Sequence, residues 1–499
     1  MAEVEGKTGV SQQKVQFEHD ELYQAYAAKG EEWHRQMTRR LMRKVDLHLL
    51  PLLVVMYLLN FLDRNNLSQA RLGTLEEDLG MSGTDFNLAT SILFVGYLLM
   101  QLPSNLLLTR VRPSLFLGIA MGIWGVISAC QAATQSFAGL VVARFFLGFV
   151  EAPFFPGAVM LILAHGQGAD DRRSSWYTRQ ELSYRIAWFY AGSSLANAFG
   201  GLIGAGVLGN LHMSHGISGW RWLFIIEGSI TVALSLLIPI LLPNYPATTS
   251  WLDDEEKAYA QWRLINDAGE ADDTGASTIK EALIAVFADK RIYLFILLQH
   301  ASLLSQTFQY FFPTIVQTLN YSNIVTLLIT APVWIATFLV SLVVTWTSGK
   351  TNDRSIHIIC LMAVSIIGCI ICTATTNLGA RFFGMFLMPM GAVSAYQIII
   401  AWVANSFPRP LVKRSAAIAT ANMIGNTASI YGSYMWPSSS GPRYIPGGSA
   451  TASVALLVAL MAFVIRVVHV RMNKGLEEKE NEVVEDEQLD APRGFRYIL

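Results

Sequence analysis

The chain contains 499 residues, of which 53% are hydrophobic and 15% are charged, and its mean hydropathy is +0.39. This composition is too apolar for a soluble protein of this length and predicts an all-α polytopic membrane protein. The formal net charge of −1 argues against a nucleic-acid partner. No cleavable signal pattern precedes the first apolar stretch, so we expect that stretch to be a transmembrane helix.

Residues 1–45 form a polar tail that becomes basic just before the first span. Lysines and arginines then gather in alternate connections between spans, so we expect both termini and the connection 244–290 on the cytoplasmic side. We expect the plasma membrane to be the membrane crossed. Twelve apolar spans, each long enough to cross a bilayer as a helix, lie at 47–67, 86–109, 113–134, 137–163, 185–208, 220–242, 291–312, 324–347, 356–376, 381–404, 414–436 and 449–470.

Short matches between the two halves of the chain indicate an internal duplication. The triplet RFF at 144–146, in the fourth span, recurs at 381–383, in the tenth. In the fifth and eleventh spans an arginine precedes an asparagine by twelve residues, as Arg185 precedes Asn197 and Arg414 precedes Asn426. With the polar connection between six spans and six, these matches predict two parallel six-helix pseudo-repeats.

The repeat divides the chain into five predicted parts: a cytoplasmic tail at 1–45, a six-helix half at 46–243, a cytoplasmic linker at 244–290, a second six-helix half at 291–472 and an acidic cytoplasmic tail at 473–499. The first half carries extra residues at 164–174, between its fourth and fifth spans. These residues are a genuine cytoplasmic loop, an alternative splice form or a product of the gene model, and the sequence leaves all three open.

Two charged residues lie inside the fourth span, Arg144 and Glu151. A charge near the middle of a membrane helix costs roughly 2.5 to 3.5 kcal/mol, so a pair requires a reason to be retained. Seven residues is about two helical turns, which puts both side chains on one face but about 10.5 Å apart along the axis. They therefore need partners elsewhere, and Asp63 and Arg64 in the first span are the natural counter-charges. A buried structural ion pair, or a place for Asp63 and Arg64 in the headgroup region, is the alternative.

These four residues sum to zero charge, and protonation of either carboxylate leaves a net positive cavity that attracts an anion. We therefore predict proton coupling by Asp63 and Glu151 and binding of a substrate carboxylate by Arg144, whose guanidinium offers a fork of donors. Arg64 is a further candidate for substrate binding. The amides Asn197, Gln299 and Asn426 also lie inside spans and are candidates for substrate contact, although most such residues hydrogen-bond between helices.

Several segments are similar to one family of transporters. They are YLLNFLDRNNLSQARLGTLEEDLGMSG, YLLMQLPSNLLLTRVRPS, RFFLGFVEAPFFPG, SSWYTRQELSYRIAWFY, GWRWLFIIEGS, KRSAAIATANMIGN and the terminal FRYIL. Together they resemble the fungal anion:cation symporters of the major facilitator superfamily, the allantoate and nicotinate permease group, over roughly residues 35–499. The resemblance implies proton-coupled uptake of small organic anions and adds Tyr97 to the substrate-binding residues.

The sequence leaves three functions open. The first is a proton-coupled importer of a small carboxylate, the second an exporter of a metabolite by proton antiport, and the third a nutrient sensor that binds without transport. We expect no cofactor, no metal and no enzymatic activity, since no cofactor loop, metal cluster or activated nucleophile is visible. The expected partners are a small organic anion, a proton and the lipid bilayer, with the protein as a monomer.

Overall fold

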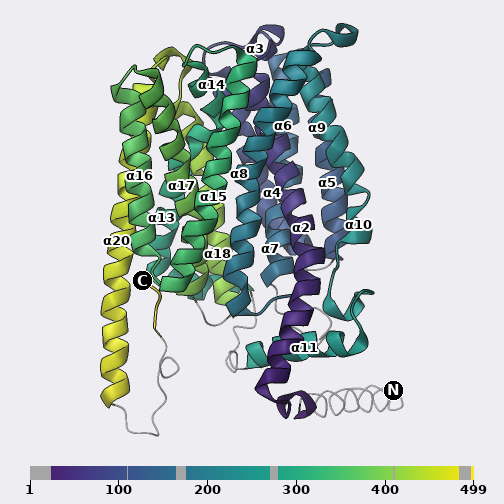
Figure 1. The fold of residues 1–499 in the computed structure, drawn as a ribbon, viewed down its shortest axis with the longest axis vertical. Helices are drawn as coiled ribbons and strands as arrows, with labels where there is room; N and C mark the ends of the chain where they lie inside the picture. Colours follow the sequence, from purple (N-terminus) through teal and green to yellow (C-terminus); the bar gives the residue numbers. More distant parts are fainter. Residues whose placement is uncertain (1–23, 109–110, 164–175, 270–278, 408–410, 483–495) are drawn as a thin grey trace.

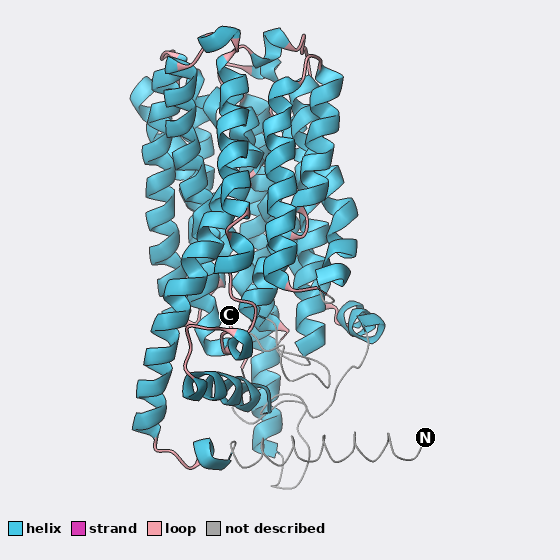
Figure 2. Cartoon of the chain, turned by 90° about the vertical axis from the view of Figure 1, so that its right-hand side faces the viewer, coloured by secondary structure: helices cyan, strands magenta, loops and turns pink. Residues whose placement is uncertain are grey.

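The computed structural model describes residues 24–108, 111–163, 176–269, 279–407, 411–482 and 496–499. These residues fold into helices joined by short turns, and they include no strand. The helices stand nearly parallel in a single bundle (Figures 1 and 2). The all-α fold predicted from the composition is confirmed. The extra residues at 164–174 lie outside the described part.

Ten of the described helical segments are long and apolar enough to cross a membrane. They are α2 (Glu31–Ala70), α4 (Asp85–Leu108), α5 (Pro113–Cys130), α6 (Phe137–Glu151) with α7 (Phe154–Leu163), α8 (Arg179–Asn210), α9 (Gly219–Ser235) with α10 (Ile238–Leu241), α15 (Asn323–Thr351), α16 (Ser355–Ala374), α17 (Leu378–Ser406) and α20 (Ile445–Glu482). Shorter helices between them are α3 (Leu75–Asp78), α11 (Asp254–Gly269) and α12 (Ile279–Ala288).

The two remaining predicted spans, at 291–312 and 414–436, are interrupted helices. The first consists of α13 (Arg291–Ser305), the 3-10 turn η4 (Thr307–Phe311) and α14 (Phe312–Gln317), and the second of α18 (Leu411–Asn426), α19 (Ala428–Gly432) and the 3-10 turn η5 (Ser433–Met435). Pro313 stands in the first turn of α14, where its missing N–H is tolerated. Backbone of this irregular kind is found at membrane depth where it is buried in protein or lines a cavity.

Helices from the two parts of the chain occupy opposite sides of the bundle. In Figure 1, α2 to α10 lie on the right and α13 to α20 on the left, with α8 and α15 in contact between them. A Cβ on Gly201 of α8 would lie 2.4 Å from the Thr330 hydroxyl and 2.8 Å from the Leu327 carbonyl oxygen. The absence of a side chain at this position therefore lets α8 and α15 approach closely across the bundle.

One end of the bundle, which we call the terminal end, carries both terminal segments of the described chain (Figure 1). With 40 residues, α2 is about 60 Å long, twice the ~30 Å of a bilayer core, and it projects from this end. The linker helix α11 packs against the projection, where Glu256 forms ion pairs with Lys44 and Arg40 and Trp262 stacks on His34.

A short extended segment, Arg496–Leu499, also lies against the terminal end. The Tyr497 backbone N–H donates to Asn473 Oδ1 at 2.7 Å, and the Tyr497 carbonyl oxygen accepts from Asn473 Nδ2 at 2.9 Å. The Ile498 carbonyl oxygen accepts from the Trp402 indole at 3.0 Å and bonds to His469 Nδ1 at 2.8 Å. These contacts tie the segment to α17 and α20.

The other end of the bundle, which we call the far end, is closed by hydrogen bonds between the two sides. They run from Asn87 Nδ2 to the Ser433 carbonyl, from Arg71 Nη2 to Ser438 Oγ, from Asn323 Nδ2 to the Leu72 carbonyl and from Ser68 Oγ to the Tyr310 carbonyl, at 2.6 to 2.7 Å. Nearer the terminal end the two sides meet at aromatic edges, as in the contact of Tyr190 with Tyr396. A ligand held between the two sides is thus shut off from the far end.

Candidate functional site

A polar pocket lies between the two sides of the bundle, and its free volume is about 70 Å³. A cavity of this size holds a few water molecules. It is lined by residues of both sides, namely Tyr57, Asn60, Phe61, Arg64, Phe94, Tyr97, Glu151, Phe155, Tyr190, Ser193, Leu303, Gln306, Gln309, Tyr310, Val393, Tyr396, Gln397, Asn422, Asn426 and Ser429. Both interrupted helices contribute, since Tyr310 belongs to η4 and Ser429 to α19.

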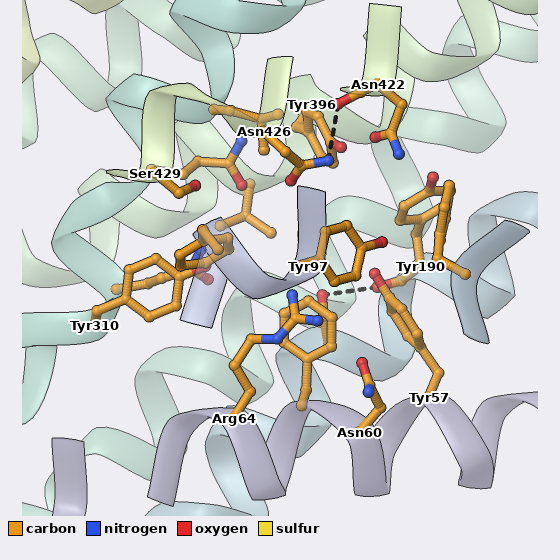
Figure 3. Close-up of a pocket in the computed structure, with 18 of the residues that line it drawn as sticks. Tyr57, Asn60, Arg64, Tyr97, Tyr190, Tyr310, Tyr396, Asn422, Asn426 and Ser429 are labelled. Carbon is orange, nitrogen blue, oxygen red and sulfur yellow. Dashed lines mark hydrogen bonds between the residues drawn. The ribbon is translucent and has the colours of Figure 1, made fainter. Parts of the chain in front are cut away.

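An ion pair between Arg64 and Glu151 forms one wall of this pocket. Arg64 Nε and Nη2 both donate to Glu151 Oε2, at 3.1 and 2.8 Å. The guanidinium carbon lies 5.3 Å from the ring centres of Phe61 and Tyr97, and Figure 3 shows the side chain rising from α2 toward Tyr97. Glu151 is 1% exposed and Arg64 9%. The pocket therefore carries one buried cation that is neutralised by one buried carboxylate.

Close packing of α4 against α6 brings Glu151 to α2. A Cβ on Gly148 would lie 1.9 Å from the Leu93 carbonyl oxygen, and a Cβ on Gly96 would lie 2.1 Å from the Phe145 carbonyl oxygen. Real Cβ atoms do not approach oxygen this closely, so both positions require glycine. Because the two backbones touch, the face of α6 that carries Arg144 and Glu151 reaches the centre of the first side.

Arg144 is 2% exposed but does not line the pocket. Its Nη2 donates to the Arg64 carbonyl oxygen at 3.0 Å, and its Nε donates to the Ala89 carbonyl oxygen at 3.4 Å. Arg144 thus holds the backbone of α2 at the residue that faces the pocket. In this conformation Arg64, and not Arg144, presents a guanidinium to the pocket.

Asp63 faces away from the pocket, into the space between α2, α5 and α9. It is fully buried and accepts hydrogen bonds from Ser128 Oγ at 2.6 Å, Thr231 Oγ1 at 2.7 Å and Trp124 Nε1 at 3.3 Å. Asp63 and Arg64 are adjacent on a helix, so their side chains point about 100° apart. Both side chains lie within the bundle and not on its outer surface.

The other predicted substrate contacts are divided between the pocket and its surroundings. Tyr97 and Asn426 line the pocket, and Asn426 donates to the Asn422 carbonyl oxygen at 2.8 Å (Figure 3). Gln299 lies behind Asn422, whose Oδ1 it approaches at 3.4 Å. Asn197 lines a separate, smaller cavity of about 10 Å³ together with Asn65, to which it is hydrogen-bonded at 2.9 Å.

Sequence reasoning passed over several pocket residues and one buried acid. The tyrosines Tyr57, Tyr190 and Tyr310 line the pocket and are at least 94% buried, yet in an apolar span a tyrosine does not stand out from ordinary packing residues. Glu227 of α9, in the segment GWRWLFIIEGS, is 1% exposed. Its signal was a carboxylate inside an apolar span, the same signal that identified Glu151.

A family model described as the Major Facilitator Superfamily matches residues 53–433. Among curated proteins, the chain is 34% identical to the MFS-type transporter cnsO of Penicillium expansum, over 85% of this chain and 82% of that protein. It is 30% identical to the major facilitator-type transporter hxnP of Emericella nidulans, over 82% of this chain and 81% of that protein.

Solved structures with a similar fold include a bacterial homologue of the human lysosomal transporter Spinster in an inward-facing, unoccupied conformation. The TM-score is 0.62, the identity 14%, and the match covers 87% of this chain and 97% of that one. At this identity the likeness supports the fold and leaves the ligand open.

Proposed function

Because this chain belongs to the major facilitator superfamily, we propose that it is a secondary transporter that takes up a small organic anion together with a proton by alternating access. The observation that carries the proposal is the buried ion pair of Arg64 with Glu151 on the pocket wall. While Glu151 is ionised, its Oε2 accepts hydrogen bonds from two N–H groups of Arg64. Once Glu151 takes up a proton, those donors are free for a substrate carboxylate.

The charge balance supports coupling. Arg64 with ionised Glu151 sums to zero, and Arg64 with protonated Glu151 and a bound monocarboxylate also sums to zero. A buried charge without a partner is strongly unfavourable in a membrane protein, so the loaded and the empty pocket are the two states that can change conformation at low cost. This arrangement ties movement of the anion to movement of a proton.

The substrates that fit are small carboxylates with polar or aromatic parts, such as nicotinate, allantoate or pantothenate, which agrees with the resemblance to the allantoate and nicotinate permease group. Aromatic rings at Tyr57, Tyr97 and Tyr190 offer stacking surfaces and hydroxyl groups. Amides at Asn422 and Asn426, from the opposite side of the bundle, offer hydrogen bonds. Competition by a panel of carboxylates in permease-deficient cells identifies the substrate.

We also propose that the terminal end of the bundle faces the cytoplasm and that the protein lies in the plasma membrane. Arg39, Arg40, Arg43 and Lys44 stand on the projecting part of α2, as expected of residues on the cytoplasmic side. A tag placed before residue 24 should stay inaccessible to antibody in intact cells and become accessible after permeabilisation. Labelling of intact cells would reverse the assignment.

The coupling role of Glu151 is tested with Glu151→Gln in reconstituted vesicles. The amide mimics the protonated carboxyl, so this variant should lose accumulation driven by an inward proton gradient but retain exchange of labelled for unlabelled substrate, since exchange requires binding and conformational change without net proton release. Glu77→Gln, at an exposed position of α3, is the matched control and should behave like the parent protein. Full accumulation by Glu151→Gln would remove Glu151 from the coupling mechanism. Export of the substrate in exchange for protons by the parent protein would favour the antiport alternative.

A further inference from the structure

The space between α2, α5 and α9 holds a second buried carboxylate close to Asp63. On α9, Glu227 precedes Thr231 by four residues, so the two side chains share one face of that helix. Thr231 donates to Asp63 at 2.7 Å, which shows that this face points at α2. On α2, Asn66 follows Asp63 by three residues and is likewise fully buried. The two helices run in opposite directions, so Asn66 and Glu227 stand one turn nearer the far end than Asp63 and Thr231.

The polar groups of Asn66 and Glu227 have few hydrogen-bond partners. Neither carboxyl oxygen of Glu227 and neither amide atom of Asn66 makes a well-formed hydrogen bond among the described residues, although the Asn66 amide lies beside the Glu227 carboxyl group as its polar neighbour. Both side chains are at least 99% buried. Such groups are rarely left without partners, so the geometry indicates that something is bound between them. A proton on Glu227 satisfies both side chains, because the acid then donates to Asn66 Oδ1 while Asn66 Nδ2 donates to the other carboxyl oxygen.

The charges around Glu227 favour the same conclusion. Asp63 is a charged group that acts on Glu227, and it carries the same sign as an ionised Glu227. Neutral groups supply the other polar contacts of the two carboxylates. Asn66 lies beside Glu227, and Ser128, Trp124 and Thr231 donate to Asp63. The described part of the chain gives Glu227 no ion pair. Two carboxylates in one apolar space do not both ionise readily, and Asp63 already has three donors that stabilise its charge.

We propose that Glu227 is a second proton-binding site, separate from the substrate pocket, and that it exchanges this proton with Asp63 during the transport cycle. In the exchange the O–H bond on Glu227 breaks and an O–H bond forms on Asp63, and the negative charge passes the other way. The pair keeps its one proton during this exchange, then loses it to water on one side of the membrane and regains one from water on the other side. Release and uptake of that proton on opposite sides of the membrane adds one proton to the one carried by Glu151. The exchange step rests on the proposed function, whereas the protonation of Glu227 does not.

The first test is infrared difference spectroscopy of the purified protein near pH 7, comparing the parent protein with Glu227→Gln. The parent should show a protonated-carboxyl band that shifts in heavy water and is missing from Glu227→Gln. The exposed Glu77→Gln variant should keep the band. A Glu227→Gln spectrum with that band unchanged would overturn the proposal, whatever the protein transports. Should Glu227→Gln not fold, Asn66→Leu is compared with the parent protein instead. Loss of the Asn66 amide beside Glu227 should change the frequency of the protonated-carboxyl band, and an unchanged band would overturn the proposal.

The second test measures coupling in vesicles clamped at zero membrane potential with an inward gradient of one pH unit. Each coupled proton contributes about tenfold to the accumulation ratio under these conditions. The parent should therefore approach a ratio of about a hundredfold, and Glu227→Gln a ratio of about tenfold, with counterflow preserved in both. Equal ratios in the two proteins would refute the second coupled proton. No accumulation in the parent, together with a normal infrared band, would instead refute the proposed function.

Discussion

The contrast between two arginines gives the sharpest test of the pocket geometry. Arg64 donates through Nε and Nη2 to one carboxyl oxygen on the pocket wall, while Arg144 donates to the backbone carbonyls of Arg64 and Ala89. Lysine retains the positive charge but has no planar fork. Arg64→Lys should therefore lose one of two charge-assisted hydrogen bonds to the substrate carboxylate. At about 1.5 to 3 kcal/mol for such a bond, the affinity should fall roughly 10- to 150-fold.

The matched variant Arg144→Lys should keep the substrate affinity within about threefold and lower the thermal stability by about 1 to 3 kcal/mol, since it weakens a buried contact that holds α2. Equilibrium binding to the purified protein, with the carboxylate that the competition panel identifies, measures the first quantity. Thermal unfolding in detergent measures the second. If Arg144→Lys weakened binding as strongly as Arg64→Lys, Arg144 would belong to the bound pocket and the assignment from this conformation would be refuted.

Two further predictions concern the packing of the bundle. Gly148→Ala should lower the unfolding temperature and reduce transport, because its Cβ would stand 1.9 Å from the Leu93 carbonyl oxygen and force α6 away from α4 at a cost of about 1 to 3 kcal/mol. The control Gly206→Ala has open space around the new Cβ and should be nearly neutral. Equal effects of the two substitutions would contradict the packing argument. Asn473→Ala should speed backbone hydrogen exchange at Tyr497, because the Tyr497 backbone N–H and carbonyl both bond to the Asn473 side chain. Unchanged exchange, measured by mass spectrometry, would show that the C-terminal segment does not rely on Asn473.

Much of the architecture could be predicted from the sequence, because a bilayer imposes a simple rule on each segment. A helix must satisfy its own backbone groups and be apolar for about 20 residues, and both properties are local. The same rule isolated Arg144 and Glu151, since a charge in such a segment is rare whatever the fold. Helical periodicity also showed that these two residues share a face without pairing.

The sequence alone did not determine the direction in which the charged side chains point once the helices are assembled. Asp63 and Arg64 are neighbours in sequence, yet one side chain enters the space between α2, α5 and α9 and the other the pocket. That choice depends on the rotation of α2 about its axis, which packing against α8 and α9 sets. The interruptions within the spans at 291–312 and 414–436 were likewise unpredicted, because their irregular backbone is stabilised by neighbouring helices and not by local sequence.

Local sequence therefore determined that the chain crosses a membrane many times, where its spans lie and which charges they contain. Only the tertiary structure decided which of those charges meet. Glu151 pairs with Arg64, Arg144 supports the backbone behind Arg64, and Glu227 lies on the face of α9 that points at Asp63. The physical reason is that hydropathy acts on each segment separately, whereas an ion pair depends on the positions and rotations of two helices that are distant in the chain.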